Sequence, residues 1–234
     1  MRDHAELLDR LSIAYAERAP RSAAGNERAQ KVLVDGGSHT IRLTAPFPPR
    51  IAAARGAWLT DEDSHRILDY WQGHLSNILG HNPKVVTRAL VRALEAGYGL
   101  QAGFADNLQT ETAEILCRQT GAEQVRFTTS GTLATMYTSL LARAFTGRKL
   151  VLKVGGGWHG AQPWALKGVG YHPEQDNGFQ GVEGEGVPAG VTEKVIVTRF
   201  NDPDRLRDDF RQVGDQLACF IVEPFLGGGG LVPA

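Results

Sequence analysis

The residues Phe127-Thr128-Thr129-Ser130-Gly131-Thr132 join a run of strand-forming residues to a helical pattern without an intervening loop. Val125 to Thr129 is predicted to form a strand, and residues 131–145 have the apolar spacing of a helix. A strand that leads directly into a helix is typical of α/β folds. The free amides at the start of that helix, with two hydroxyls and a glycine, favour a phosphate site. Ordinary helix capping by Ser130 is the alternative.

Strands and helices alternate in the rest of the chain. Predicted strands are Leu150-Val151-Leu152-Lys153-Val154, Lys194 to Thr198 and Leu217 to Glu223, and Asp204 to Val213 is a predicted helix. This alternation predicts a mostly parallel central sheet flanked by helices. The glycine- and acid-rich residues 171–190 are typical of a long loop.

The first third of the chain has a different pattern. Apolar residues at helical spacing predict a helix from Asp3 to Arg18, which Pro20 ends. Residues 36–49 predict looping or extended chain, and residues 57–60 and 66–71 predict a hairpin. Two further helices are expected at residues 85–96 and 108–119. We therefore expect an N-terminal helix with a small β segment over residues 1–75, and the first part of a larger domain over residues 76–234.

The composition argues against several classes of protein. The 234 residues include 25 Lys+Arg and 26 Asp+Glu, a net charge of -1, so the chain has no overall attraction to nucleic acid or to an anionic membrane surface. No stretch approaches the ~18 to 20 apolar residues of a membrane span, and no secretory signal is evident. Cys117 and Cys219 are expected to be buried free thiols. We expect a cytoplasmic protein that binds a small molecule.

Three more candidate sites follow predicted strands, where open α/β sheets bind their ligands. In Gly155-Gly156-Gly157-Trp158-His159-Gly160 the indole could lie against a planar ring. His159 is either a base or a hydrogen-bonded structural residue. Asn201 offers an amide, with plain turn chemistry as the alternative. Glu223 places a carboxylate at the end of an apolar strand, where an acid usually has a partner or a function.

Two segments lie outside this pattern. Arg42 could bind a substrate carboxylate through its guanidinium group, and a solvated surface arginine is the alternative. The run Gly227-Gly228-Gly229-Gly230 lacks the Lys-Ser/Thr of a nucleotide-binding P-loop, so it predicts a flexible loop.

Taken in order, these segments resemble the class III aminotransferases, which are pyridoxal-phosphate enzymes of fold type I, and among them most closely the glutamate-1-semialdehyde aminomutases. The resemblance extends from about Val32 to the last residue. It is carried by the Arg42 segment, Gly80-His81, Ser130-Gly131-Thr132, Trp158-His159-Gly160, Asn201-Asp202 and Val222-Glu223-Pro224. It implies a three-layer fold, a pyridoxal 5'-phosphate cofactor, an amino or keto substrate, amino-group transfer and a homodimer.

The resemblance also implies a role for each motif. Ser130, Gly131 and Thr132 would bind the cofactor phosphate, and Trp158 would stack on the pyridine ring with His159 beside it. Asn201 would lie near the oxygen side of the ring, and Glu223 near the substrate face.

Two further residues would bind the substrate. Arg42 would bind its carboxylate, and His74 stands where the aminomutases have an active-site tryptophan. Leu133 replaces the glutamate that usually follows Ser-Gly-Thr. These departures from the family pattern affect the inferred substrate more than the inferred cofactor.

In the family, the aspartate that pairs with the pyridine nitrogen and the lysine that forms the Schiff base both follow the Glu-Pro segment. This sequence ends at Val232-Pro233-Ala234, and Lys149, Lys153 and Lys167 match no Schiff-base motif. We therefore expect an incomplete copy of a longer enzyme. One half of a split enzyme and a non-catalytic binding or scaffold protein are the alternatives.

Overall fold

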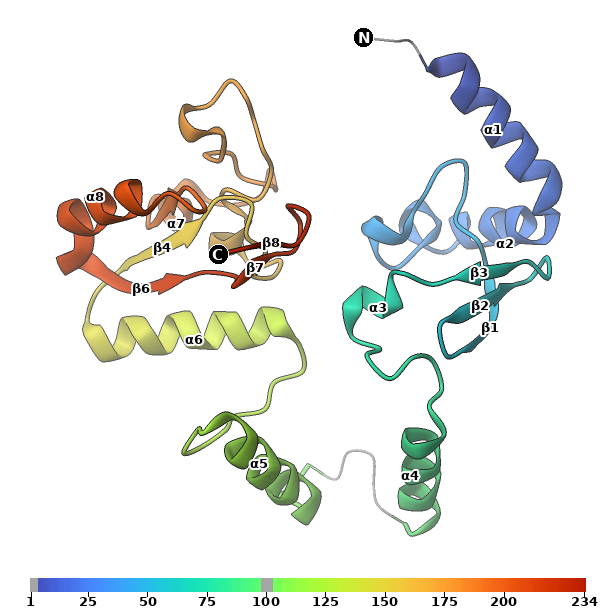
Figure 1. Cartoon of the computed structure of the whole chain (residues 1–234), viewed down its shortest axis with the longest axis horizontal. Coiled ribbons are helices and arrows are strands. Elements are labelled where there is room, and N and C mark those ends of the chain that lie inside the picture. Colours follow the sequence, from blue (N-terminus) through green and yellow to red (C-terminus); the bar gives the residue numbers. More distant parts are fainter. Residues whose placement is uncertain (1–3, 98–102) are drawn as a thin grey trace. The chain divides into compact units, whose positions relative to one another are not determined.

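The computed structural model describes residues 4–97 and 103–234, which form two compact units divided between Phe104 and Ala105 (Figure 1). No helix within those two ranges is long and apolar enough to cross a membrane. The division of the chain at residues 75 and 76 stays a prediction.

The first unit combines helices with a small antiparallel sheet of order β1-β2-β3. Its elements are α1 (Ala5–Arg18), α2 (Pro20–Gln30), β1 (Ile51–Arg55), β2 (Trp58–Asp61), β3 (Arg66–Leu68), α3 (Gln72–Leu75) and α4 (Lys84–Glu95), with the 3-10 turns η1 (Val34–Gly36) and η2 (Thr40–Arg42). The predicted first helix and hairpin are confirmed. The segment around Arg42 is a helical turn and not extended chain, because the Leu43 amide bonds back to the Thr40 carbonyl at 2.9 Å.

Helix α2 and strand β1 are among the elements of this unit that are absent from the sequence prediction. Helix α2 begins at Pro20, the residue expected only to end α1. Proline fits the first turn of a helix because its missing N–H is not needed there. Strand β1 has the sequence Ile51-Ala52-Ala53-Ala54-Arg55, which lacks the alternation that marks a half-buried strand.

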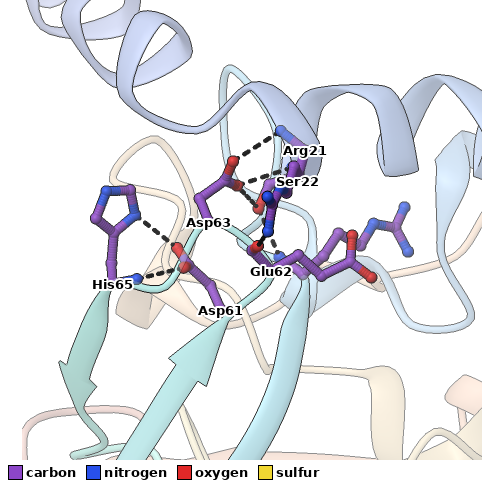
Figure 2. A network of polar contacts seen from close by, with 7 residues as sticks. Arg21, Ser22, Asp61, Glu62, Asp63 and His65 are labelled. Carbon is purple, nitrogen blue, oxygen red and sulfur yellow. Dashed lines mark hydrogen bonds and ion pairs between the residues drawn. The ribbon is translucent and has the colours of Figure 1, made fainter.

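Asp63, in the β2–β3 turn, connects the sheet to α2 (Figure 2). Its carboxylate accepts hydrogen bonds from the backbone amides of Arg21 (2.8 Å) and Ser22 (2.9 Å) and from the Ser22 hydroxyl (2.7 Å). These amides belong to the first turn of α2, whose donors have no partner within the helix. A side chain more than forty residues away therefore caps α2.

The second unit is built on a parallel sheet of order β5-β4-β6, which confirms the predicted sheet. Figure 1 shows α6 on one side of this sheet and α8 on the other. The elements are α5 (Asn107–Thr120), α6 (Gly131–Thr146), β4 (Leu150–Val154), η3 (Pro163–Leu166), η4 (Asp176–Gly178), α7 (Ala189–Thr192), β5 (Val195–Thr198), α8 (Pro203–Val213), η5 (Gly214–Gln216), β6 (Leu217–Ile221), β7 (Phe225–Leu226) and β8 (Val232–Pro233).

The core of this unit lies around the central strand β4. Val151 packs with Val195 and Val197 of β5, and Trp164 and Ala165 of η3 cover the same cluster. Burial on both faces accounts for the continuous apolar run that made β4 predictable. The loop predicted for residues 171–190 is also confirmed, apart from η4 and the start of α7.

Two sequence predictions are corrected in this unit. Val125 to Thr129 is not a strand: no neighbouring strand in the described residues pairs with it, and Phe127 stays 45% exposed. Strand propensity without a partner ladder leaves extended chain. Cys117 and Cys219 are free thiols as expected, but both are half-buried and not buried.

We predict that Asp63→Ala lowers the midpoint of urea unfolding, measured by circular dichroism, because the first turn of α2 loses its cap. Burial opposes the charged form of Asp63, but hydrogen bonds from Arg21 and Ser22 outweigh burial and lower the pKa of the carboxyl. Because the folded state favours the ionised carboxylate, its ionisation stabilises the fold at neutral pH. This contribution is lost as the pH falls through the folded-state pKa.

The difference between wild type and Asp63→Ala should therefore shrink as the pH falls through the lowered pKa of Asp63. Glu62→Ala, in the same turn, is the matched control, since the Glu62 side chain is exposed and takes no part in the cap. Equal midpoints for the two variants would contradict the assignment.

Candidate functional site

The N-terminus of α6 forms an open cradle of hydrogen-bond donors. Ser130 caps the helix by accepting a hydrogen bond from the Leu133 amide at 3.2 Å. Within the described part of the chain, the amides of Gly131 and Thr132 have no hydrogen-bond partner. A Cβ added to Gly131 would meet no atom within 4 Å, so the space beside these amides is open. Capping and anion binding are compatible, because the Ser130 hydroxyl still has its proton to donate.

The loop after β4 lies directly against this helix start. Gly160 has φ +92°, and a Cβ there would fall 2.6 Å from the Thr132 Oγ1 atom and 2.7 Å from its Cα. The Ala161 amide donates to Thr132 Oγ1 at 3.3 Å, and Thr135 Oγ1 donates to the His159 carbonyl at 2.7 Å. Two segments that the sequence singled out separately are therefore held together by close backbone contact.

Trp158 and His159 have opposite environments in this loop. The Trp158 side chain is 51% exposed, whereas His159 is 5% exposed and its ring stacks on Trp164 with 6.5 Å between the ring centroids. Burial, with a smaller contribution from the Lys153 charge, lowers the pKa of His159 to about 4. His159 is therefore neutral at physiological pH, and its buried Nε2 atom has no hydrogen-bond partner among the described residues.

Lys153 matches no Schiff-base motif in the sequence, but its environment in the structure is unusual for a lysine. It lies in β4 with 0% exposure, and its ammonium group donates to the carbonyls of Gly157 (3.1 Å), Ala165 (2.9 Å) and Lys167 (2.8 Å). A charged residue inside an apolar strand was the signal, since lysine is almost never fully buried without partners. Burial lowers the pKa of Lys153 to about 8, and the Glu223 carboxylate acts in the opposite direction.

Asn201 and Glu223 follow β5 and β6, just as Trp158 follows β4. Because the three strands are parallel, their carboxyl ends lie at the same edge of the sheet. Asn201 has φ +54° and donates to the Pro233 carbonyl at 2.9 Å. Glu223 is half-buried and accepts from the Gly227 amide at 3.4 Å, and residues 227–230 form the β7–β8 loop.

The two remaining candidates belong to the first unit. Arg42 is exposed at the end of the η2 turn. His74 is exposed, has φ +62°, and its ring lies 4.8 Å from that of Trp71 and 5.2 Å from that of His39. Their placement against the second unit stays a prediction. Among the described residues, no group of three or more His, Cys, Asp or Glu could hold a metal ion.

Known proteins are similar to this chain in sequence and in fold. The family described as Aminotransferase class-III matches residues 42–234. Glutamate-1-semialdehyde 2,1-aminomutase of Deinococcus radiodurans is 36% identical over 229 residues, covering 95% of this chain and 51% of that protein. The corresponding protein of Thermoplasma volcanium is 34% identical over 207 residues, covering 88% and 48%.

Solved structures agree with the sequence comparison. An omega-transaminase from Sphaerobacter thermophilus superposes with a TM-score of 0.83 at 33% identity, covering 91% of this chain and 49% of that one. A structure described as a transaminase with PLP bound gives a TM-score of 0.85 at 31% identity, covering 92% and 50%.

These comparisons confirm the predicted three-layer, fold-type I architecture over the part that is covered. The chain spans about half the length of the curated relatives it matches. Its sequence and its fold place this chain in the class III aminotransferase family.

Proposed function

We propose that this chain carries the cofactor-binding part of a pyridoxal-phosphate enzyme that transfers an amino group between an amino compound and a carbonyl compound. One observation carries the proposal: the start of α6 and the loop bearing Trp158 are held together through Gly160 and Thr132. Family membership supports it, as do the relatives described as aminomutases and transaminases.

The donors at the start of α6 fit the phosphate group of this cofactor. Two unpaired amides, the Ser130 and Thr132 hydroxyls and the positive end of the helix dipole match a dianion. The open space at Gly131 leaves room for phosphate oxygens. Trp158 fits the other end of the cofactor, because its half-exposed indole offers a face to a planar ring.

The other candidates keep the roles that the family resemblance implies. Asn201 would donate to an oxygen of the ring, and Glu223 would face the substrate. His159 would lie beside Trp158 in the cofactor site. When bound, pyridoxal phosphate supplies an electron sink for the substrate carbon. The residues of this chain would bind the phosphate group and orient that ring.

A carboxylate substrate follows if Arg42 binds it, and His74 would be the residue that alters substrate choice. Intramolecular transfer on a semialdehyde and an ordinary ω-aminotransferase reaction are the two variants. Spectral titration of the cofactor-loaded protein with candidate amines separates them. We also propose a homodimer in the cytoplasm, which sedimentation and cell fractionation test.

Cofactor binding is tested by equilibrium dialysis of the chain against pyridoxal phosphate and against pyridoxal, which lacks the phosphate. The cradle predicts tighter binding of the phosphorylated form by at least about tenfold, since hydrogen bonds to a charged group contribute about 1.5 to 3 kcal/mol each. Equal affinity for the two compounds would rule out the cradle. Amino-group transfer is tested by supplying candidate amines and carbonyl compounds to the cofactor-loaded protein.

We predict that Gly131→Ala folds normally and loses affinity for both pyridoxal phosphate and inorganic phosphate by at least about tenfold, because the new methyl group occupies the space of a phosphate oxygen. Phosphorus NMR measures the binding. Gly190→Ala is the matched control: this glycine also lies in a helix, and a Cβ there also meets nothing within 4 Å. A Gly131→Ala variant that binds phosphate like wild type would show that the anion lies elsewhere.

We predict that Trp158→Ala weakens pyridoxal phosphate binding about threefold to tenfold, as expected for the loss of about 0.5 to 1.5 kcal/mol of ring stacking. Binding of inorganic phosphate should stay unchanged, and Trp158→Phe should restore most of the loss. Equilibrium dialysis gives both affinities. An equal loss for both ligands would mean that Trp158 supports the cradle and does not contact the ring.

A further inference from the structure

Lys153 is a fully buried charged residue to which the proposed function assigns no role. Burying an ammonium group costs free energy unless each of its donors finds an acceptor. All three Lys153 donors do so, and all three acceptors are backbone carbonyls. None of those carbonyls belongs to β4 itself. The side chain therefore stabilises the segment that follows its own strand.

The three carbonyls lie on both sides of Trp158 along the chain. Gly157 directly precedes the tryptophan, while Ala165 and Lys167 lie at the end of η3 and just after it. One ammonium group thus closes the segment from residue 157 to residue 167 into a loop. Because Trp158 is 51% exposed, packing holds its indole only in part, so the position of the backbone matters for where the ring can lie.

The opposite side of this loop is attached to α6. Thr135 donates to the His159 carbonyl at 2.7 Å, and Thr132 accepts from the Ala161 amide at 3.3 Å. The residues on either side of Trp158 are therefore fixed from two directions, by Lys153 of the sheet and by threonines of the helix that bears the cradle.

We propose that Lys153 is a positioning residue for the cofactor ring: its ammonium group holds the backbone around Trp158 and so fixes the indole relative to the N-terminus of α6. This role rests on the proposed function, because it takes Trp158 as the residue that contacts the ring. Lys153 itself touches neither cofactor nor substrate in this assignment.

The charges around Lys153 bear on this role. Glu223, after β6, favours the charged ammonium, and the Lys153 charge in turn lowers the pKa of the neighbouring His159, which is neutral at physiological pH. Lys167 directs its own ammonium away, to the carbonyls of Thr192 (3.1 Å) and Val195 (2.8 Å). Lys153 therefore remains charged at neutral pH, with Glu223 as its counter-charge.

Lys153→Met tests the role, because methionine keeps most of the apolar length and removes the donors. Hydrogen exchange should become at least about tenfold faster at the amides of Gly156, Gly157 and Ala165, which is the effect of losing about 1.4 kcal/mol of local stability. Lys167→Met is the matched control. It should speed exchange at residues 189–195 and leave the loop unchanged, because its bonds go to Thr192 and Val195.

Ligand binding separates positioning from general support of the fold. Lys153→Met should lose affinity for pyridoxal phosphate by at least about threefold and keep the wild-type affinity for inorganic phosphate, since only the ring contact depends on Trp158. Unchanged exchange in the loop, or equal losses for the two ligands, would overturn the proposal. If the wild-type chain binds no pyridoxal phosphate, the proposed function fails, while exchange still decides whether Lys153 holds the loop.

The wild-type chain provides a second test if Lys153→Met does not fold. Burial lowers the pKa of Lys153 to about 8, so raising the pH through this value removes one of three donors. Exchange in the loop, corrected for its intrinsic pH dependence, should then increase in the wild type and in Lys167→Met alike. A loop that exchanges at the same corrected rate on both sides of pH 8 would overturn the proposal.

Discussion

The close approach of Gly160 to Thr132 is the contact on which the candidate site depends. It brings the backbone of the loop after β4 against the first turn of α6, at a distance that no side chain on residue 160 would permit. The phosphate cradle belongs to the start of α6, and Trp158, which would stack on the ring, belongs to the loop. Their spacing, which has to match the length of one cofactor, depends on this close approach together with the hydrogen bonds of Thr132, Thr135 and Lys153 to the loop.

In both units a charged side chain forms hydrogen bonds with backbone groups of another segment. Asp63 accepts from two amides at the start of α2, and Lys153 donates to three carbonyls around η3. Asp63 is an anion that accepts from amides, whereas Lys153 is a cation that donates to carbonyls. Both supply partners to backbone groups that have none where regular structure begins or ends. In each case the charged side chain fixes backbone groups at the end of a regular element, at the start of α2 in one unit and around η3 in the other.

The sequence predicts those parts of the fold that depend on local pattern. Strand β4 and the helix starting at Gly131 follow from apolar runs and a capping serine, and the parallel order follows from their alternation. Phe127 and its neighbours have strand propensity, but a strand also needs a partner, which a local pattern does not reveal. Trp158 was found from its position after a strand. The role of Lys153 is not predictable from local pattern, because it depends on carbonyls up to 14 residues away.

The cap on α2 also constrains the order in which the chain acquires structure. Ser22 and its carboxylate partner are separated by 41 residues, so the first turn of α2 gains that partner only after the β2–β3 turn has been synthesised and folded. Closing a loop of that length lowers the chain entropy before the new hydrogen bonds can offset the loss. On the ribosome, α2 would therefore emerge with a frayed first turn and become fully stable only once the hairpin has formed.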